Sequence, residues 1–72
     1  MTTRKLVNLM MKSSNYNPYT GKLSGKDNVL AAIELAKKFK EFADDGYTDE
    51  AMDIDSNQWS EVIDKLIIMK NK

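Results

Sequence analysis

The sequence predicts an all-α fold, a small three-helix bundle. Three segments carry apolar residues at helical spacing, and stretches containing Pro or Gly separate them. The chain has 72 residues, of which 42% are hydrophobic and 31% charged, a composition typical of a soluble globular domain. Short amphipathic helices bury their apolar faces against one another, so we expect residues 1–72 to form a single helical domain.

The first predicted helix covers about Thr3 to Ser13. Leu6, Val7, Leu9 and Met10 fall on one side of a helical wheel. The segment is short, so a strand remains an alternative. The residues that follow, 13–21, are rich in Ser and Asn and include Pro18 and Gly21, which predicts a turn.

The second predicted helix begins after Ser24, which can cap it together with Asp27 in an aspartate version of the capping box. Gly46 is expected to end the helix in the left-handed conformation. The apolar face of this helix comprises Val29, Ala32, Ile33, Leu35, Ala36, Phe39, Phe42 and Ala43.

The third predicted helix begins near Ser56 or Asn57 and ends near Lys70. Its apolar face comprises Trp59, Val62, Ile63, Leu66, Ile67 and Met69. Before it, Thr48 could cap a fourth, short helical turn near residues 48–53. We expect the Phe, Trp and Met side chains to pack in the core.

The composition disfavours most enzyme classes. The chain has no Cys and no His, so it lacks a thiolate nucleophile, a disulfide and the usual general base. Residues 53–64 place oxygen ligands at the spacing of a calcium loop, but Gln58 replaces the required Gly and Asp64 the bidentate Glu. Capping of the third helix by Asp55 or Ser56 explains the same residues. We therefore predict a non-enzymatic protein without cofactor or metal.

No apolar run approaches the length that a membrane-spanning helix needs. The basic first residues precede a broken apolar stretch, unlike a secretory signal. The sequence therefore predicts a cytoplasmic protein that does not associate with membranes.

The net charge of zero conceals a division along the chain. Residues 1–40 carry eight bases and two acids (+6), whereas residues 41–72 carry nine acids and three bases (−6). Asp44 and Asp45 lie at the predicted end of a helix, where the helix dipole disfavours negative charge. Either an ion pair with the basic first helix or an external cationic partner would explain them.

This asymmetry leads to the first hypothesis, that the acidic segment 41–61 binds a basic surface on another protein. The size and charge suit an inhibitor or regulator carried by a phage or plasmid. The residues expected to make the contact are Glu41, Asp44, Asp45, Asp49, Glu50, Asp53 and Asp55.

A second hypothesis is binding of single-stranded nucleic acid, because one segment interleaves basic and aromatic residues. These residues are Lys12, Tyr16, Tyr19, Lys22 and Lys26. The competing interpretation, which we favour at this point, is that the two tyrosines pack against the helices with only their hydroxyls outward.

A third hypothesis is a structural or assembly subunit. Leu30 and Ile68 fall on the polar faces of the second and third helices. If they adjoin in the fold, they form an apolar patch through which the chain could form a homodimer.

Overall fold

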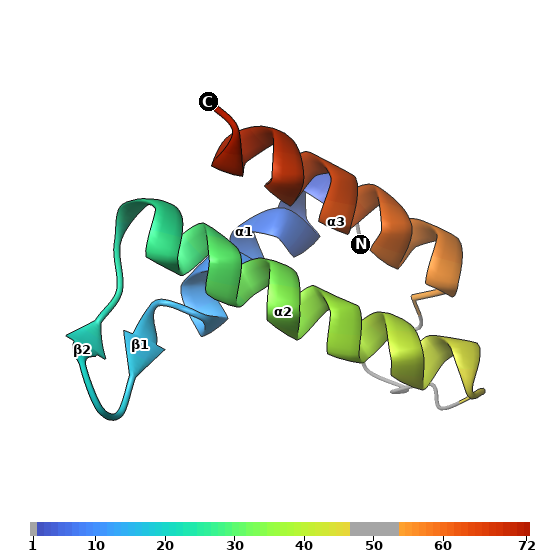
Figure 1. Cartoon of the computed structure of the whole chain (residues 1–72). Helices are drawn as coiled ribbons and strands as arrows, with labels where there is room; N and C mark the ends of the chain where they lie inside the picture. Colours follow the sequence, from blue (N-terminus) through green and yellow to red (C-terminus); the bar gives the residue numbers. More distant parts are fainter. Residues whose placement is uncertain (1, 47–53) are drawn as a thin grey trace.

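Three helices and a two-stranded antiparallel sheet make up the computed structural model, which describes residues 2–46 and 54–72. The elements in chain order are α1 (Thr3–Ser13), β1 (Tyr16–Asn17), β2 (Gly21–Lys22), α2 (Gly25–Asp44) and α3 (Ser56–Lys70) (Figure 1). The prediction of a small protein built on three helices is confirmed. The short turn predicted near residues 48–53 lies outside the described residues.

Helix α1 begins at the predicted residue, so the alternative of a strand is wrong. The Thr2 hydroxyl oxygen accepts a hydrogen bond from the Lys5 backbone N–H (3.2 Å) and thereby caps the helix. Leu6, Val7 and Met10 are buried on one side of the helix. The helical spacing of these three residues is what fixes α1 against the rest of the fold.

The segment after α1 forms a β-hairpin that corrects the all-α prediction. Tyr16 lies opposite Lys22 and Asn17 opposite Gly21, with residues 18–20 as the turn. The Asn17 side-chain oxygen accepts a hydrogen bond from the Tyr19 N–H (2.8 Å), and Gly21 adopts φ +88°. The turn was predicted from its Pro and Gly. The two-residue strands are too short to show a period-2 pattern in the sequence.

Helix α2 begins and ends where predicted, but it lacks the predicted side-chain cap at its start. Ser24 precedes the helix in an extended conformation, but its side chain makes no capping hydrogen bond, so the predicted capping box is wrong. Gly46 follows the helix with φ +84°, and its N–H donates to the carbonyl of Ala43 (3.2 Å). The left-handed end at Gly46 is therefore confirmed.

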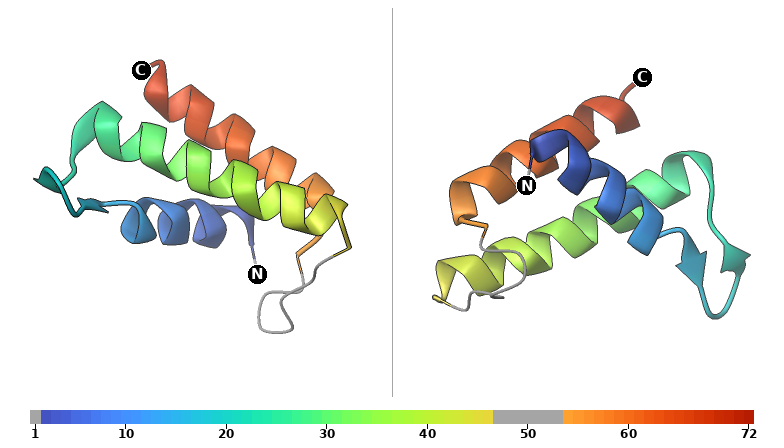
Figure 2. Two further views of the ribbon diagram at one scale, coloured as in Figure 1. Left: turned by 60° about the horizontal axis from the view of Figure 1, so that its bottom comes forward. Right: turned by 180° about the vertical axis from the view of Figure 1, so that it is seen from behind.

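The core lies between all three helices. Helices α2 and α3 run antiparallel side by side, and α1 packs against both (Figures 1 and 2). The rings of Phe39 and Trp59 stack with their centroids 5.1 Å apart and their planes 10° from parallel. The buried apolar residues are Leu6, Val7, Met10, Val29, Ala32, Ile33, Ala36, Ile54, Trp59, Val62, Ile63 and Leu66.

On each helix, the predicted apolar face is broader than the part of the helix surface that the other helices cover. Phe42, expected in the core, is 54% exposed, and Leu9, Ile67 and Met69 are also exposed. A domain of this size buries a smaller fraction of its surface than a larger domain does, and no further element covers the margins of the helices in the described structure. Apolar side chains at those margins therefore remain in contact with solvent.

Candidate interaction site

The described residues of the predicted acidic segment gather where α2 ends and α3 begins. Glu41, Asp44 and Asp45 lie on the last turn of α2 and its cap, Asp55 precedes α3, and all four are exposed. We call these four residues the acidic end. The other three predicted contact residues, Asp49, Glu50 and Asp53, lie outside the described residues.

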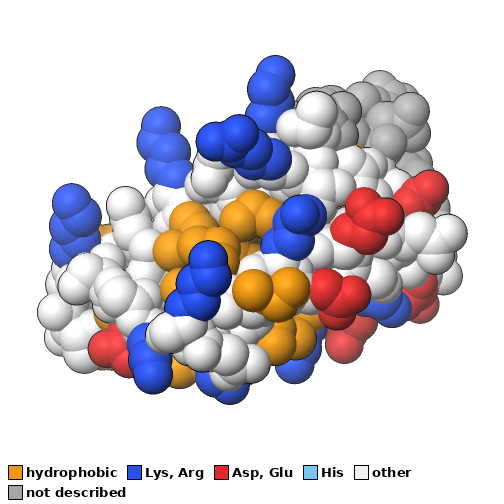
Figure 3. All heavy atoms as spheres, turned by 90° about the horizontal axis from the view of Figure 1, so that it is seen from above, with side chains coloured by type: hydrophobic (Ala, Val, Ile, Leu, Met, Phe, Trp, Pro, Cys, Tyr) orange, Lys and Arg blue, Asp and Glu red, His pale blue; other side chains and the backbone are white. Residues whose placement is uncertain are grey.

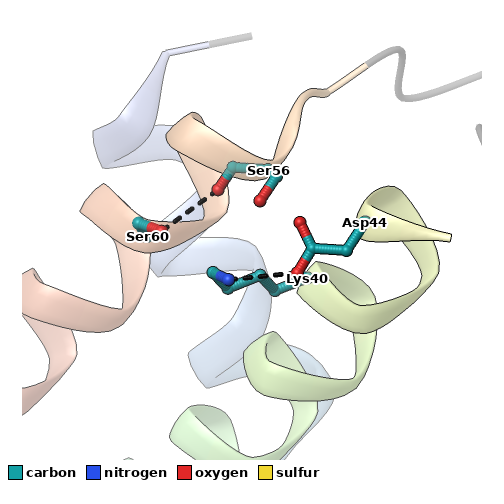
Figure 4. A network of polar contacts seen from close by, with 4 residues as sticks. All are labelled: Lys40, Asp44, Ser56 and Ser60. Carbon is teal, nitrogen blue, oxygen red and sulfur yellow. Dashed lines mark hydrogen bonds and ion pairs between the residues drawn. The ribbon is translucent and has the colours of Figure 1, made fainter. Parts of the chain in front are cut away.

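Asp44 is held by groups from two helices. Its Oδ2 lies 3.1 Å from the Lys40 Nζ one turn earlier in α2, and the Ser56 side chain at the start of α3 lies near its carboxylate (Figure 4). These two polar neighbours, Ser56 first and then Lys40, lower the pKa of the Asp44 carboxyl. The sequence offered two explanations for Asp44, an ion pair with the first helix or an external cationic partner. The structure provides a third explanation, since Lys40 belongs to α2 and Ser56 to α3.

We expect the folded protein to lose stability in acid through Asp44. Because folding lowers the pKa of Asp44, the carboxylate's contribution to the free energy of unfolding is present above the ordinary pKa of 3.8. That contribution is lost as the pH falls through the lower pKa of the folded state. Thermal unfolding midpoints measured by circular dichroism between neutral and strongly acidic pH should fall less steeply for Asp44→Asn. Asp45→Asn serves as the control. Parallel curves for wild type and Asp44→Asn would contradict the assignment.

Asp55 and Glu61 also have partners within the chain. The Asp55 carboxylate accepts a hydrogen bond from the Gln58 N–H (2.9 Å) and caps α3, which confirms the capping alternative to a calcium loop. Glu61 accepts a hydrogen bond from the Thr3 hydroxyl (3.0 Å) and so connects α3 to the start of α1. Helix capping and packing thus explain part of the negative charge.

The side chains of Glu41 and Asp45 make no hydrogen bond or ion pair with the part of the chain that the structure describes. Within the described ranges, the ion pair is that of Lys40 and Asp44, inside α2. The basic residues of α1 therefore do not neutralise the acidic end. Seen from the side of α3, most acidic side chains lie toward one end, with Lys and Arg spread over the rest (Figure 3).

The hairpin brings together the residues of the second hypothesis. Tyr16 and Lys22 are cross-strand neighbours, and Tyr19 occupies the turn. Lys12 lies on the last turn of α1 and Lys26 on the first turn of α2, so both flank the hairpin.

The exposure of the two tyrosines corrects one sequence-based expectation. Tyr19 is 94% exposed and Tyr16 is 66% exposed. Neither ring is therefore packed against the helices in the way that we favoured from the sequence. Both rings are available to a ligand at the surface.

The structure does not unite Leu30 and Ile68 in one groove. Both side chains are exposed, as the sequence indicated. Ile68, however, lines a groove between α1 and α3 whose lining residues all belong to these two helices, whereas Leu30 lies on α2. The groove also includes Arg4 and Lys65, which sequence reasoning missed. The one signal for it was the position of Ile68 on a polar helix face.

Comparisons of the chain with models of protein families, with curated proteins and with solved structures find no match. In the described residues, no helix has the length and apolar character needed to cross a membrane.

Proposed function

We propose that the chain is a small non-enzymatic interaction module, a three-helix bundle that binds a basic surface of another protein through its acidic end. The observation that carries this proposal is the exposure of Glu41 and Asp45 without partners in the described structure, beside Asp44 and Asp55. Two helix termini converge there, so the four carboxylates occupy one end of a rigid frame. A partner with Lys or Arg at matching positions would gain specificity and a faster association rate.

Phe42 strengthens this proposal. It lies between Glu41 and Asp45 in α2, and its side chain is 54% exposed. Exposed charges alone contribute little affinity, since water and salt screen them. Interfaces gain most of their binding energy from a few aromatic or Arg side chains that are surrounded by polar residues. An exposed aromatic ring within one helical turn of Glu41 and Asp45 supplies that combination.

The test is a pull-down with the tagged full chain, with and without nuclease, followed by an affinity measurement with the recovered partner. We expect Glu41→Lys with Asp45→Lys to weaken binding by at least about tenfold, because attraction becomes repulsion at both positions. Glu34→Lys with Asp64→Lys changes the net charge equally at exposed positions away from the acidic end, and should bind like the wild type. Equal loss in both double variants, or in neither, would reject the acidic end as the binding site.

A second candidate function is binding of single-stranded nucleic acid through the hairpin. The specific observation in its favour is the 94% exposure of Tyr19 at the hairpin turn, beside the cross-strand pair of Tyr16 and Lys22. Bases stack on exposed aromatic rings, and neighbouring Lys side chains contact the phosphates. This function would use the hairpin, a surface of opposite charge to the acidic end.

A further inference from the structure

A groove between α1 and α3 forms a second candidate docking surface, separate from the acidic end. Its volume is about 370 Å³. Each helix contributes three residues at spacing i, i+3 and i+4, which places them on one helix face. We call this the α1–α3 groove; it is lined by Arg4, Val7 and Asn8 of α1 and by Lys65, Ile68 and Met69 of α3.

The centre of the α1–α3 groove is apolar and open to solvent. Val7 is buried and forms part of the core, whereas Ile68 is 59% exposed and Met69 is 39% exposed. Figure 3 shows apolar side chains gathered on the α3 side of the molecule, with Lys and Arg on several sides of them and acidic side chains at one end. Burying these aliphatic side chains against a partner would be favourable by about 25 cal/mol for each Å² of apolar surface removed from water.

Both walls of the α1–α3 groove carry a cation. Arg4 precedes Val7 by one turn of α1, and Lys65 precedes Ile68 by one turn of α3. No acidic residue lines this groove, all of whose residues lie in the described helices. An occupant with carboxylates on both sides of an apolar stripe would therefore be complementary to it in charge and in hydrophobicity.

We propose that the α1–α3 groove binds an amphipathic helix of a partner protein, one whose apolar stripe is flanked by Asp or Glu. The stripe packs on Ile68 and Met69, and the flanking carboxylates pair with Arg4 and Lys65. An open groove between two helices can take a third helix, which contacts it through anchors at i, i+3, i+4 and i+7.

Two other occupants fit the groove less well. Single-stranded nucleic acid would stack its bases on aromatic rings, and the lining of the α1–α3 groove contains none. A membrane surface is best contacted by apolar side chains that project from a convex face with cations around them, whereas Val7 and the apolar residues beside it line a hollow.

The test uses the full chain labelled with ¹⁵N and a synthetic helical peptide with Leu at i, i+3, i+4 and i+7 and Glu on both sides. We expect NMR shift changes concentrated on the six groove residues. A matched peptide with Gln in place of Glu should bind about tenfold more weakly, because it lacks the two exposed charge pairs.

Variants of the chain make the test specific. Ile68→Glu should abolish peptide binding, whereas Leu30→Glu, at an exposed apolar residue of α2 outside the groove, should leave it unchanged. The double variant Arg4→Glu, Lys65→Glu should no longer bind the Glu peptide and should instead bind a peptide whose apolar stripe is flanked by Lys. The Glu41→Lys, Asp45→Lys variant should still bind the Glu peptide, which separates this proposal from the function of the acidic end.

Several outcomes would overturn the proposal. Equal affinity for the Glu and Gln peptides would show that Arg4 and Lys65 do not contribute to binding. NMR shift changes at other residues would show that the peptide does not bind in the α1–α3 groove. Binding to anionic vesicles or to a single-stranded oligonucleotide but not to the Glu peptide would assign the surface to those ligands. Self-association of the chain alone, detected by sedimentation and lost in Ile68→Glu, would assign it to a second copy.

Discussion

Leu66→Ala is expected to lower the free energy of unfolding by about 3 kcal/mol, which lies within the range for such a core substitution. The Leu66 side chain has no solvent exposure, and it belongs with Leu6, Met10 and Val62 to the largest fully buried side chains. Removing most of that side chain loses the transfer free energy of its carbons and leaves a cavity between the helices.

The size of the chain makes this effect large. At about 0.05–0.15 kcal/mol per residue, a domain of 72 residues has a total stability of roughly 4–11 kcal/mol. Urea unfolding followed by the helical circular dichroism signal should therefore show a much lower midpoint for Leu66→Ala. Ile67→Ala, at the exposed next residue, should cost about 1 kcal/mol or less. Equal costs at the two positions would contradict the packing of α3.

Tyr19→Ala is expected to weaken binding of a single-stranded oligonucleotide by about tenfold or more, if the hairpin is the nucleic-acid site. The substitution removes the ring that is 94% exposed at the turn, so it should leave the fold intact. Tyr19→Phe keeps the ring that stacks on a base and should retain most of the affinity. Fluorescence anisotropy with a labelled oligonucleotide measures both variants.

The salt dependence of the same titration gives a second measure. Each phosphate contact by a Lys side chain contributes about 0.7 to the slope of log K against log salt for a single strand. Lys22→Ala, opposite Tyr16 in the hairpin, should reduce the slope by about that amount. Absence of binding at low salt by the wild-type chain would eliminate this candidate function.

The sequence was a good guide where local chemistry decides the structure. Helix α1 begins at Thr3 because Thr2 caps it, and α2 ends before Gly46 because that residue adopts positive φ. The start of α3 at Ser56 follows from the cap by Asp55. These boundaries depend on residues within one turn of each helix end, and such signals are readable in a sequence.

The sequence was a poor guide where packing between helices decides which side chains are exposed and which surfaces form. Phe42 has the spacing of a core residue but lies beyond the surface that α3 and α1 cover. The α1–α3 groove depends on how two helices separated by more than 40 residues approach each other, so Arg4 and Lys65 give no sign of it singly. The exposure of Tyr19 likewise depends on the hairpin pointing away from the helices.

The stacking of Phe39 on Trp59 has a practical consequence for experiments on this protein. The chain contains one Trp, and its ring lies against a ring of α2 with 3% of its surface exposed. The intrinsic emission of the indole therefore comes from a single site at the junction of α2 and α3. A ligand that shifts this emission must alter that junction, whereas one bound at the hairpin surface should leave the spectrum unchanged. Optical measurements on the unlabelled chain can thus separate a change in helix packing from binding at the surface.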